Sequence, residues 1–249
     1  MSKLLWIGHS FTRRIRNHLA PKVGRIHGRH GRNIILDIDI SLHDVDRAKK
    51  CATSFGIDRV INEIFTISSD IIFMHELASK REIIDEYEAN VIVIDCGSND
   101  LAQMPCICTN DVLLLADQTF DFATNLSLRS KLVVINAVLP REGNIAGTPD
   151  VFRENADLYN SIIKTHCDAS TRVKFNGMRG FRYTNISGQS TIPRPVSEWS
   201  EDLIHPDQSI GEYIHRVKLF ILDHTWIMLG HEKRMTNKQR RRYLRHHPY

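Results

Sequence analysis

The sequence predicts an α/β fold in which helices pack against a mostly parallel β-sheet. Short β-branched apolar segments alternate along the chain with longer segments whose apolar residues recur at helical spacing. Some of the short segments, such as residues 91–94 (Val-Ile-Val-Ile), are apolar at every position. Continuous apolar runs of this kind are typical of parallel strands that are covered by helices on both faces.

The individual elements follow from these two patterns. We expect strands at residues 4–8, 34–40, 61–67, 91–95, 131–138 and 172–175. We expect helices at residues 11–19, 44–55, 78–88, 111–128 and 150–166, and a last helix that starts near residue 207 and continues past residue 221. Residues 176–201 are rich in Gly, Pro and polar side chains, so we expect a long ordered loop near the sheet's edge.

Composition excludes several classes of protein. The chain has 249 residues, of which 42% are hydrophobic and 25% charged, which excludes a collagen-like or wholly disordered chain. It contains no apolar run long enough to span a membrane. The chain has five cysteines, a small and odd number, which favours free thiols over a disulfide scaffold. With no signal peptide visible either, we expect an intracellular protein, cytoplasmic or nuclear.

The net charge of +4 is unevenly distributed. Residues 1–50 carry +7 (11 basic and 4 acidic), residues 51–230 carry −9 (15 and 24), and residues 231–249 carry +6 (7 and 1). We therefore divide the chain into a domain of residues 1–228 and a basic tail of residues 229–249. The tail's basic residues are Lys233, Arg234, Lys238, Arg240, Arg241, Arg242 and Arg245. Such clusters can bind nucleic acid, but a solvated tail has the same composition, and both interpretations stay open.

Four polar residues fall where the predicted strands end, which is where open parallel sheets bind their ligands. Ser10 follows the first strand, Asn99 follows the strand at 91–95, and Asp202 and His205 follow the long loop. Together they provide a nucleophile, an oxyanion donor, a base and an acid that orients the base, which is the set required for acyl transfer. The backbone N–H of Ser10, at the start of a helix, would be a second oxyanion donor.

Three motifs carry a family resemblance: Gly8-His9-Ser10, Gly97-Ser98-Asn99-Asp100 and Asp202-Leu203-Ile204-His205. In this order they resemble the SGNH hydrolases, the GDSL esterase/lipase superfamily, over most of residues 1–225. Residues 138–141 (Val-Leu-Pro-Arg) are similar to that family as well. The resemblance implies a flavodoxin-like three-layer α/β/α sandwich with about five parallel strands.

The resemblance also implies an activity. Ser10 would be the nucleophile, His205 the base, Asp202 the acid that orients it, and Asn99 with the Ser10 amide the oxyanion hole. The substrate would be a small carboxylic ester, cleaved through an acyl-enzyme without a metal or cofactor.

Two departures from the family pattern keep an alternative open. His9 stands where the family usually has Asp, and residues 57–96 lack the glycine that the family uses as an oxyanion donor. The equivalent loop should lie within residues 68–79. The alternative is therefore a weakly active or inactive SGNH-fold accessory module that associates with nucleic acid through its basic termini.

Simpler structural roles also exist for each candidate residue. Ser10 could cap its helix, Asn99 and Asp100 could form only a turn, and Asp202 could cap a turn beside a surface His205. Cys106 and Cys108 invite a metal site, but one Cys-x-Cys lacks the second pair of ligands that zinc requires, so we expect loop thiols.

Overall fold

The computed structural model describes residues 4–8, 15, 89–178, 181, 184–186, 189–192, 195–228 and 236. Within these residues, four strands form one sheet: β1 (Leu4–Gly8), β2 (Val91–Asp95), β3 (Leu132–Asn136) and β4 (Val173–Asn176). The strand order is β1-β2-β3-β4, and every neighbouring pair is parallel. The predicted parallel sheet is confirmed, with four strands described where about five were expected. The strands expected at 34–40 and 61–67, and the helices expected at 44–55 and 78–88, lie outside the described residues.

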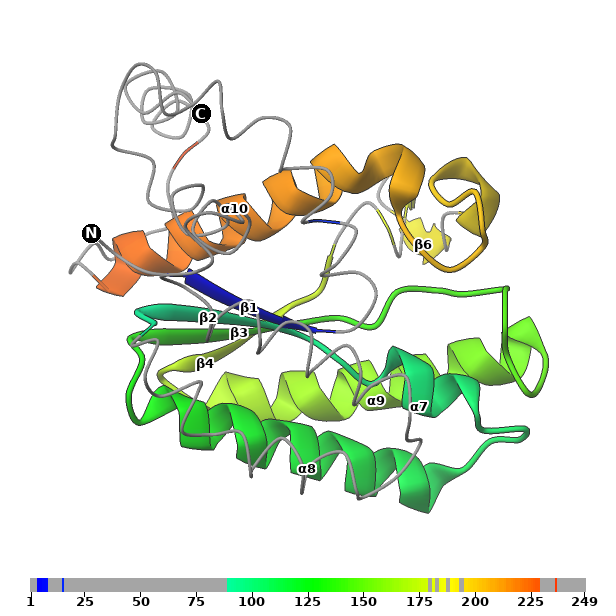
Figure 1. Ribbon diagram of the computed structural model, residues 1–249, viewed down its shortest axis with the longest axis horizontal. Coiled ribbons are helices and arrows are strands. Elements are labelled where there is room, and N and C mark those ends of the chain that lie inside the picture. Colours follow the sequence, from blue (N-terminus) through cyan, green and yellow to red (C-terminus); the bar gives the residue numbers. More distant parts are fainter. Residues whose placement is uncertain are drawn as a thin grey trace, which may run out of the picture.

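Helices cover both faces of this sheet, as Figure 1 shows. On one face lie α8 (Thr109–Ser127) and α9 (Pro149–Ala169), whose buried side chains pack with Ile92, Ile94, Val133 and Ile135. On the other lies α10 (Ile210–Met228), which packs with Val93 and Val134. Successive residues of a strand point to opposite faces of the sheet, so strands that are apolar at every position contribute to the hydrophobic core on each face. The three-layer α/β/α arrangement is confirmed.

The helices expected from the sequence form close to their predicted bounds. The helix α8 begins two residues before the expected start and ends one residue before the expected end, and α9 extends beyond its predicted range at both ends. Thr148 caps α9, because its hydroxyl accepts a hydrogen bond from the N–H of Val151. A 3₁₀ turn, η2 (Asp207–Ser209), occupies the predicted start of the last helix and leads into α10.

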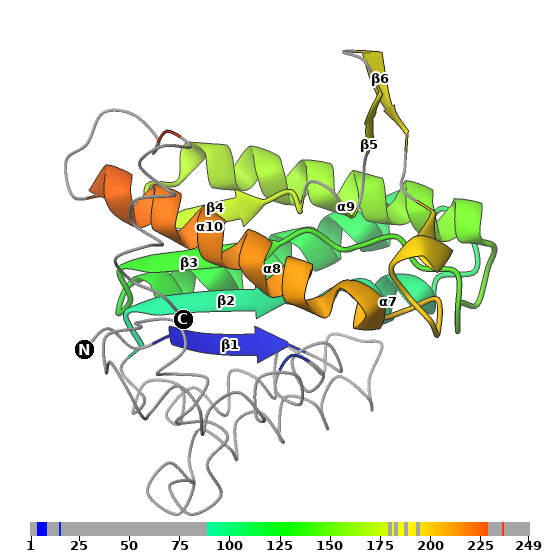
Figure 2. The ribbon, with the colours of Figure 1, turned by 90° about the horizontal axis from the view of Figure 1, so that it is seen from above.

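The segment predicted as a loop contains more structure than expected. Strands β5 (Thr184–Ile186) and β6 (Gln189–Ile192) form an antiparallel pair, and a 3₁₀ turn, η1 (Val196–Glu198), follows. Figure 2 shows this pair standing away from the main sheet. The loop prediction is wrong for these residues, because it weighed Gly and Pro above the β-branched residues at 184, 186, 191 and 192.

None of the helices that the structure describes combines the length and the apolar composition needed to cross a membrane. The basic tail lies outside the described residues, with the exception of Thr236.

Candidate active site

The site is built at the edge of the sheet where the strands end. Gly8 and Asp95 are register partners at the last positions of β1 and β2, so the chain leaves both strands at the same edge. The helix α7 (Ser98–Ala102) and the segment before α10 lie at this edge in both views (Figures 1 and 2). Ser10 is two residues beyond Gly8, and Ser10 and the loop at 68–79 lie outside the described residues. Ile15, in the helix expected after Ser10, is helical and buried.

A tight turn at Gly97 places Asn99 on the first turn of α7. Gly97 has a left-handed backbone, with φ of 90°, and is the residue before the first residue of the helix. A Cβ atom here would lie 2.9 Å from Cζ of Tyr159, which is fully buried. Glycine is therefore required both for its backbone conformation and for the close approach of the chain to Tyr159. The sequence predicts a turn at this position but not the short helix that follows it.

Arg141 holds the side chain of Asn99. Its Nη1 donates to Oδ1 of Asn99 at 3.1 Å, while its Nε and Nη2 donate to the carbonyl oxygens of Gly143 at 2.7 Å and Asn144 at 2.8 Å. Arg141 is only 4% exposed. Burial lowers the pKa of its guanidinium, and the negative charge of Asp202 opposes that shift. Because Arg141 binds the amide oxygen of Asn99, the amide nitrogen is the end of this side chain that acts as a donor.

Asp202 and His205 form a hydrogen-bonded pair in a turn that precedes α10. Oδ2 of Asp202 lies 2.7 Å from Nδ1 of His205. Oδ1 of the same carboxylate accepts the N–H groups of Ile204 at 3.0 Å and His205 at 2.8 Å, and the hydroxyl of Ser200 at 3.2 Å. Leu203 has a positive φ of 60°, which is costly for a bulky residue and turns the chain back toward the carboxylate.

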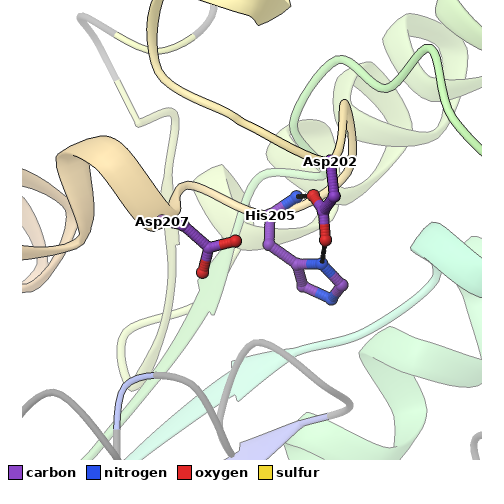
Figure 3. A group of neighbouring side chains, drawn as sticks. All are labelled: Asp202, His205 and Asp207. Atoms are coloured by element: carbon purple, nitrogen blue, oxygen red, sulfur yellow. Dashed lines mark hydrogen bonds and ion pairs between the residues drawn. The ribbon is translucent and has the colours of Figure 1, made fainter.

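These contacts set the charge of the pair. Burial opposes ionisation of Asp202, but the N–H and ring of His205 and the N–H of Ile204 outweigh it and lower the pKa of Asp202 to about 2. At neutral pH the carboxylate is therefore ionised, and Nδ1 of His205 carries the shared hydrogen. Figure 3 shows the other ring nitrogen, Nε2, directed away from Asp202. The His205 side chain is 9% exposed, whereas the Asp202 side chain is 33% exposed, so solvent reaches the carboxylate more than the ring.

Asp207 is a second carboxylate near this ring. Asp202, His205 and Asp207 each offer one potential metal ligand, and these three atoms lie within 4.8 Å of one another. Among the described residues, no other group of three or more metal-binding side chains comes this close together. Figure 3 shows the Asp207 carboxylate to the left of His205, with no dashed line joining it to the ring. Asp202 and His205 are already bound to each other, so a metal ion would compete with their hydrogen bond. The geometry therefore favours an oriented imidazole over a metal centre.

A second loop supports the turn that holds this pair. The N–H groups of Glu142 and Gly143 both donate to the carbonyl oxygen of Leu203, at 2.9 Å and 3.1 Å. Gly143 packs so tightly here that a Cβ atom would lie 2.7 Å from the carbonyl oxygen of Asp202. Because Arg141 binds Gly143 and Asn99 together, one hydrogen-bonded path connects the Asn99 side chain with the Asp202–His205 turn.

A buried polar network lies at the end of β2. Asp95 is 5% exposed and accepts hydrogen bonds from Nε1 of Trp6, Nδ2 of Asn136 at 2.8 Å and the hydroxyl of Tyr213 at 2.5 Å. Burial raises the pKa of Asp95, and these three donors act in the opposite direction. The network joins β1, β2, β3 and α10 directly beneath the edge that carries the candidate site.

The residues predicted from the sequence are therefore only partly described. Asp202 and His205 are in contact, and Asn99 is linked to their turn through Arg141. In the sequence, Arg141 stands out only as part of a family-like motif, and neither its connecting role nor the close packing of Gly143 is predicted. The single available signal was a charged residue directly after an apolar strand and Pro140. The seven basic residues of the tail named above lie outside the described residues.

Comparison with known proteins supports the fold. No family model matches the chain, and no curated protein matches its sequence. A crystal structure of a "putative acylhydrolase" from Bacteroides fragilis matches with a TM-score of 0.50 and 15% sequence identity, over 88% of this chain and 86% of that chain. At this identity the likeness concerns the fold alone. The chain shares the α/β fold of that protein, with the parallel sheet and covering helices described above.

Proposed function

We propose that the protein is a serine esterase that cleaves a small carboxylic ester through an acyl-enzyme. Ser10 is the nucleophile, His205 the base and Asp202 the acid that orients it, while Asn99 and the Ser10 N–H bind the oxyanion. The proposal requires no metal or cofactor.

The observation that carries the proposal is the Asp202–His205 pair. An imidazole whose Nδ1 is held at 2.7 Å by an ionised carboxylate has its tautomer and orientation determined. Nε2 is then able to take a proton from a hydroxyl group, and a serine needs such a base to become a nucleophile. A surface histidine would not require a carboxylate that is itself held by two backbone N–H groups.

Asn99 supports the proposal through its orientation. Because Arg141 binds the amide oxygen, the amide nitrogen is the donor that can meet a negative charge on the substrate. The N–H of Ser10, at the start of its helix, would be the second donor. A missing donor costs about 10² to 10³ in rate, so an oxyanion hole without a donor from the loop at 68–79 would still permit slow hydrolysis.

In the proposed reaction, Oγ of Ser10 attacks the ester carbonyl carbon while Nε2 of His205 removes the hydroxyl proton. The carbonyl oxygen becomes an oxyanion held by Asn99 and the Ser10 N–H. The intermediate collapses, and His205 gives its proton to the departing alcohol. Water then attacks the acyl-enzyme with His205 again as base, which releases the acid and restores Ser10.

A fluorophosphonate probe tests this proposal, because it reacts with an activated serine. We expect labelling of the full-length protein and complete loss of labelling in Ser10→Ala. Asp202→Asn should fold but should reduce ester turnover about 10⁴-fold, because an amide at this position favours the wrong tautomer of His205. Ser161→Ala, at an exposed serine of α9, is the matched control and should label like the native protein.

Two outcomes would count against the esterase. Equal labelling of Ser10→Ala and the native protein would exclude Ser10 as the nucleophile. A folded protein that neither labels nor hydrolyses any of a panel of short-chain esters would favour the accessory module described above. Binding to DNA or RNA across a salt series, with and without residues 229–249, would then test that alternative.

A further inference from the structure

Two cysteine thiols lie against each other in the loop that joins α7 to α8. Sγ of Cys106 and Sγ of Cys108 are 3.4 Å apart. Cys106 is exposed and Cys108 is half-buried, so small reagents in solution can reach the pair. The other two cysteines that the structure describes, Cys96 and Cys167, are buried, and burial raises the pKa of each to about 12. Among the described cysteines, reactivity is therefore concentrated at Cys106 and Cys108.

The protein holds these two residues in place from beneath. Asn155 of α9 is fully buried, and its side chain binds both sides of the tripeptide: Oδ1 accepts the N–H of Cys108 at 3.2 Å, and Nδ2 donates to the carbonyl oxygen of Cys106 at 2.9 Å. The loop is also anchored at Pro105, whose carbonyl oxygen would lie 2.9 Å from a Cβ atom at Gly147. The buried contacts with Asn155 and Gly147 therefore hold the backbone on both sides of the two thiols and keep the thiols adjacent.

The number of sulfur ligands decides which chemistry suits the pair. A structural zinc site needs four ligands, and no third metal-binding side chain joins these cysteines among the described residues. A disulfide needs only the two thiols. The sulfur atoms would have to approach by about 1.4 Å, from 3.4 Å to the usual S–S length of about 2.05 Å, which a small rotation of the side chains can supply.

We propose that Cys106 and Cys108 are an oxidisable dithiol, which closes to an intraloop disulfide when the protein meets a peroxide and reopens with a thiol reductant. Bridging residues with only one residue between them strains the bond, and strained or exposed disulfides are the readily reduced ones. The inference does not depend on the proposed esterase activity.

The oxidation balances with hydrogen peroxide as the oxidant. The Cys106 thiolate attacks one peroxide oxygen, so that an S–O bond forms, the O–O bond breaks, and hydroxide leaves and is protonated to water. Cys108 then attacks the Cys106 sulfur: the S–S bond forms, the S–O bond breaks, and a second water leaves. Two thiols are oxidised and one peroxide is reduced. Cys106 is the more exposed of the two thiols, so it meets the peroxide first, and the proton of Cys108 leaves with the hydroxide in the second step.

Mass spectrometry of the full-length protein tests the inference. The protein is treated with hydrogen peroxide, unfolded, alkylated with iodoacetamide and digested with trypsin. The peptide of residues 82–129 contains Cys96, Cys106 and Cys108. After oxidation, we expect this peptide to lose the mass of two hydrogen atoms and to carry a single alkyl group, on Cys96. Dithiothreitol should restore three alkyl groups.

Variants separate this disulfide from other oxidation products. Cys106→Ser and Cys108→Ser should each lose the two-hydrogen product, whereas Cys167→Ser, at a buried cysteine, should keep it. Asn155→Ala should form the disulfide more slowly if its two hydrogen bonds hold the thiols together. Three results would each overturn the proposal. The first is a disulfide to Cys51, and the second is oxidation of the thiols to stable sulfinic acids. The third is that both thiols remain open to alkylation under conditions in which the peroxide oxidises dithiothreitol in the same buffer.

Discussion

Arg141 provides the sharpest test of how this site is held together. We consider its replacement by methionine, which keeps an unbranched chain of similar length but removes every donor and the charge. Arg141 is 4% exposed, and its three strongest hydrogen bonds reach Gly143, Asn144 and Asn99. All three would be lost together.

The expected loss of stability follows from these bonds. A hydrogen bond to a charged group contributes about 1.5–3 kcal/mol net. Gly143 and Asn144 belong to a partly exposed loop, so water can replace the lost donor at their carbonyl oxygens, and the lower end of that range applies. The two short bonds, at 2.7 and 2.8 Å, then account for about 3 kcal/mol of the free energy of unfolding. The longer bond to Asn99 adds less to stability, but it orients the proposed oxyanion donor.

Urea unfolding of the native protein and of Arg141→Met measures this loss, provided that the slope of the transition is unchanged. Arg153→Met is the matched control. Arg153 also makes a 2.7 Å contact, with Asp150, but the two side chains are 47% and 73% exposed, so we expect a loss below about 1 kcal/mol. Equal small losses in both variants would refute the reasoning, because Arg141 would then behave as a surface side chain.

Three further predictions concern neighbouring residues. Gly143→Ala should lower the free energy of unfolding by about 1–3 kcal/mol, because its Cβ would lie 2.7 Å from the Asp202 carbonyl oxygen. Gly177→Ala, whose Cβ would meet a side-chain carbon at 3.8 Å, should be nearly neutral. Equal losses of the two variants in a urea titration would contradict this prediction. The pKa of Asp202 is lowered from 3.8 to about 2, so its contribution to stability is complete above the ordinary pKa and is lost as the pH falls toward about 2. Asp202→Asn should remove this acid-dependent loss. Parallel acid-unfolding curves for the native protein and the variant would oppose the assignment. Because the pKa of Asp95 is raised, the folded protein binds more protons than the unfolded chain, so stability falls as the pH rises above the ordinary value. Asp95→Asn should flatten that slope. It should also lower stability overall, since an amide has one acceptor oxygen for three donors including Tyr213. An unchanged slope above the ordinary pKa of the carboxyl would count against this assignment.

The sequence by itself determined the class of fold and the local part of the site. Continuous apolar runs at residues 91–94 and 132–135 identified parallel strands covered on both faces, because their hydrophobicity is a property of a few consecutive residues. The Asp202–His205 contact was also predictable, since three residues in one turn are enough to bring the carboxylate to the ring.

Only the tertiary structure decided the contacts between distant segments. Arg141 and Asn99 are 42 positions apart, and Asp95 and Tyr213 are 118 positions apart. No periodicity or turn pattern links such pairs, because they meet only after the strands have paired and the helices have packed. The same holds for the contact between Cys106 and Asn155, which depends on α9 lying beneath the loop before α8. Local chemistry therefore supplied the candidate groups, and long-range packing gave each of them its partner, its burial and its charge.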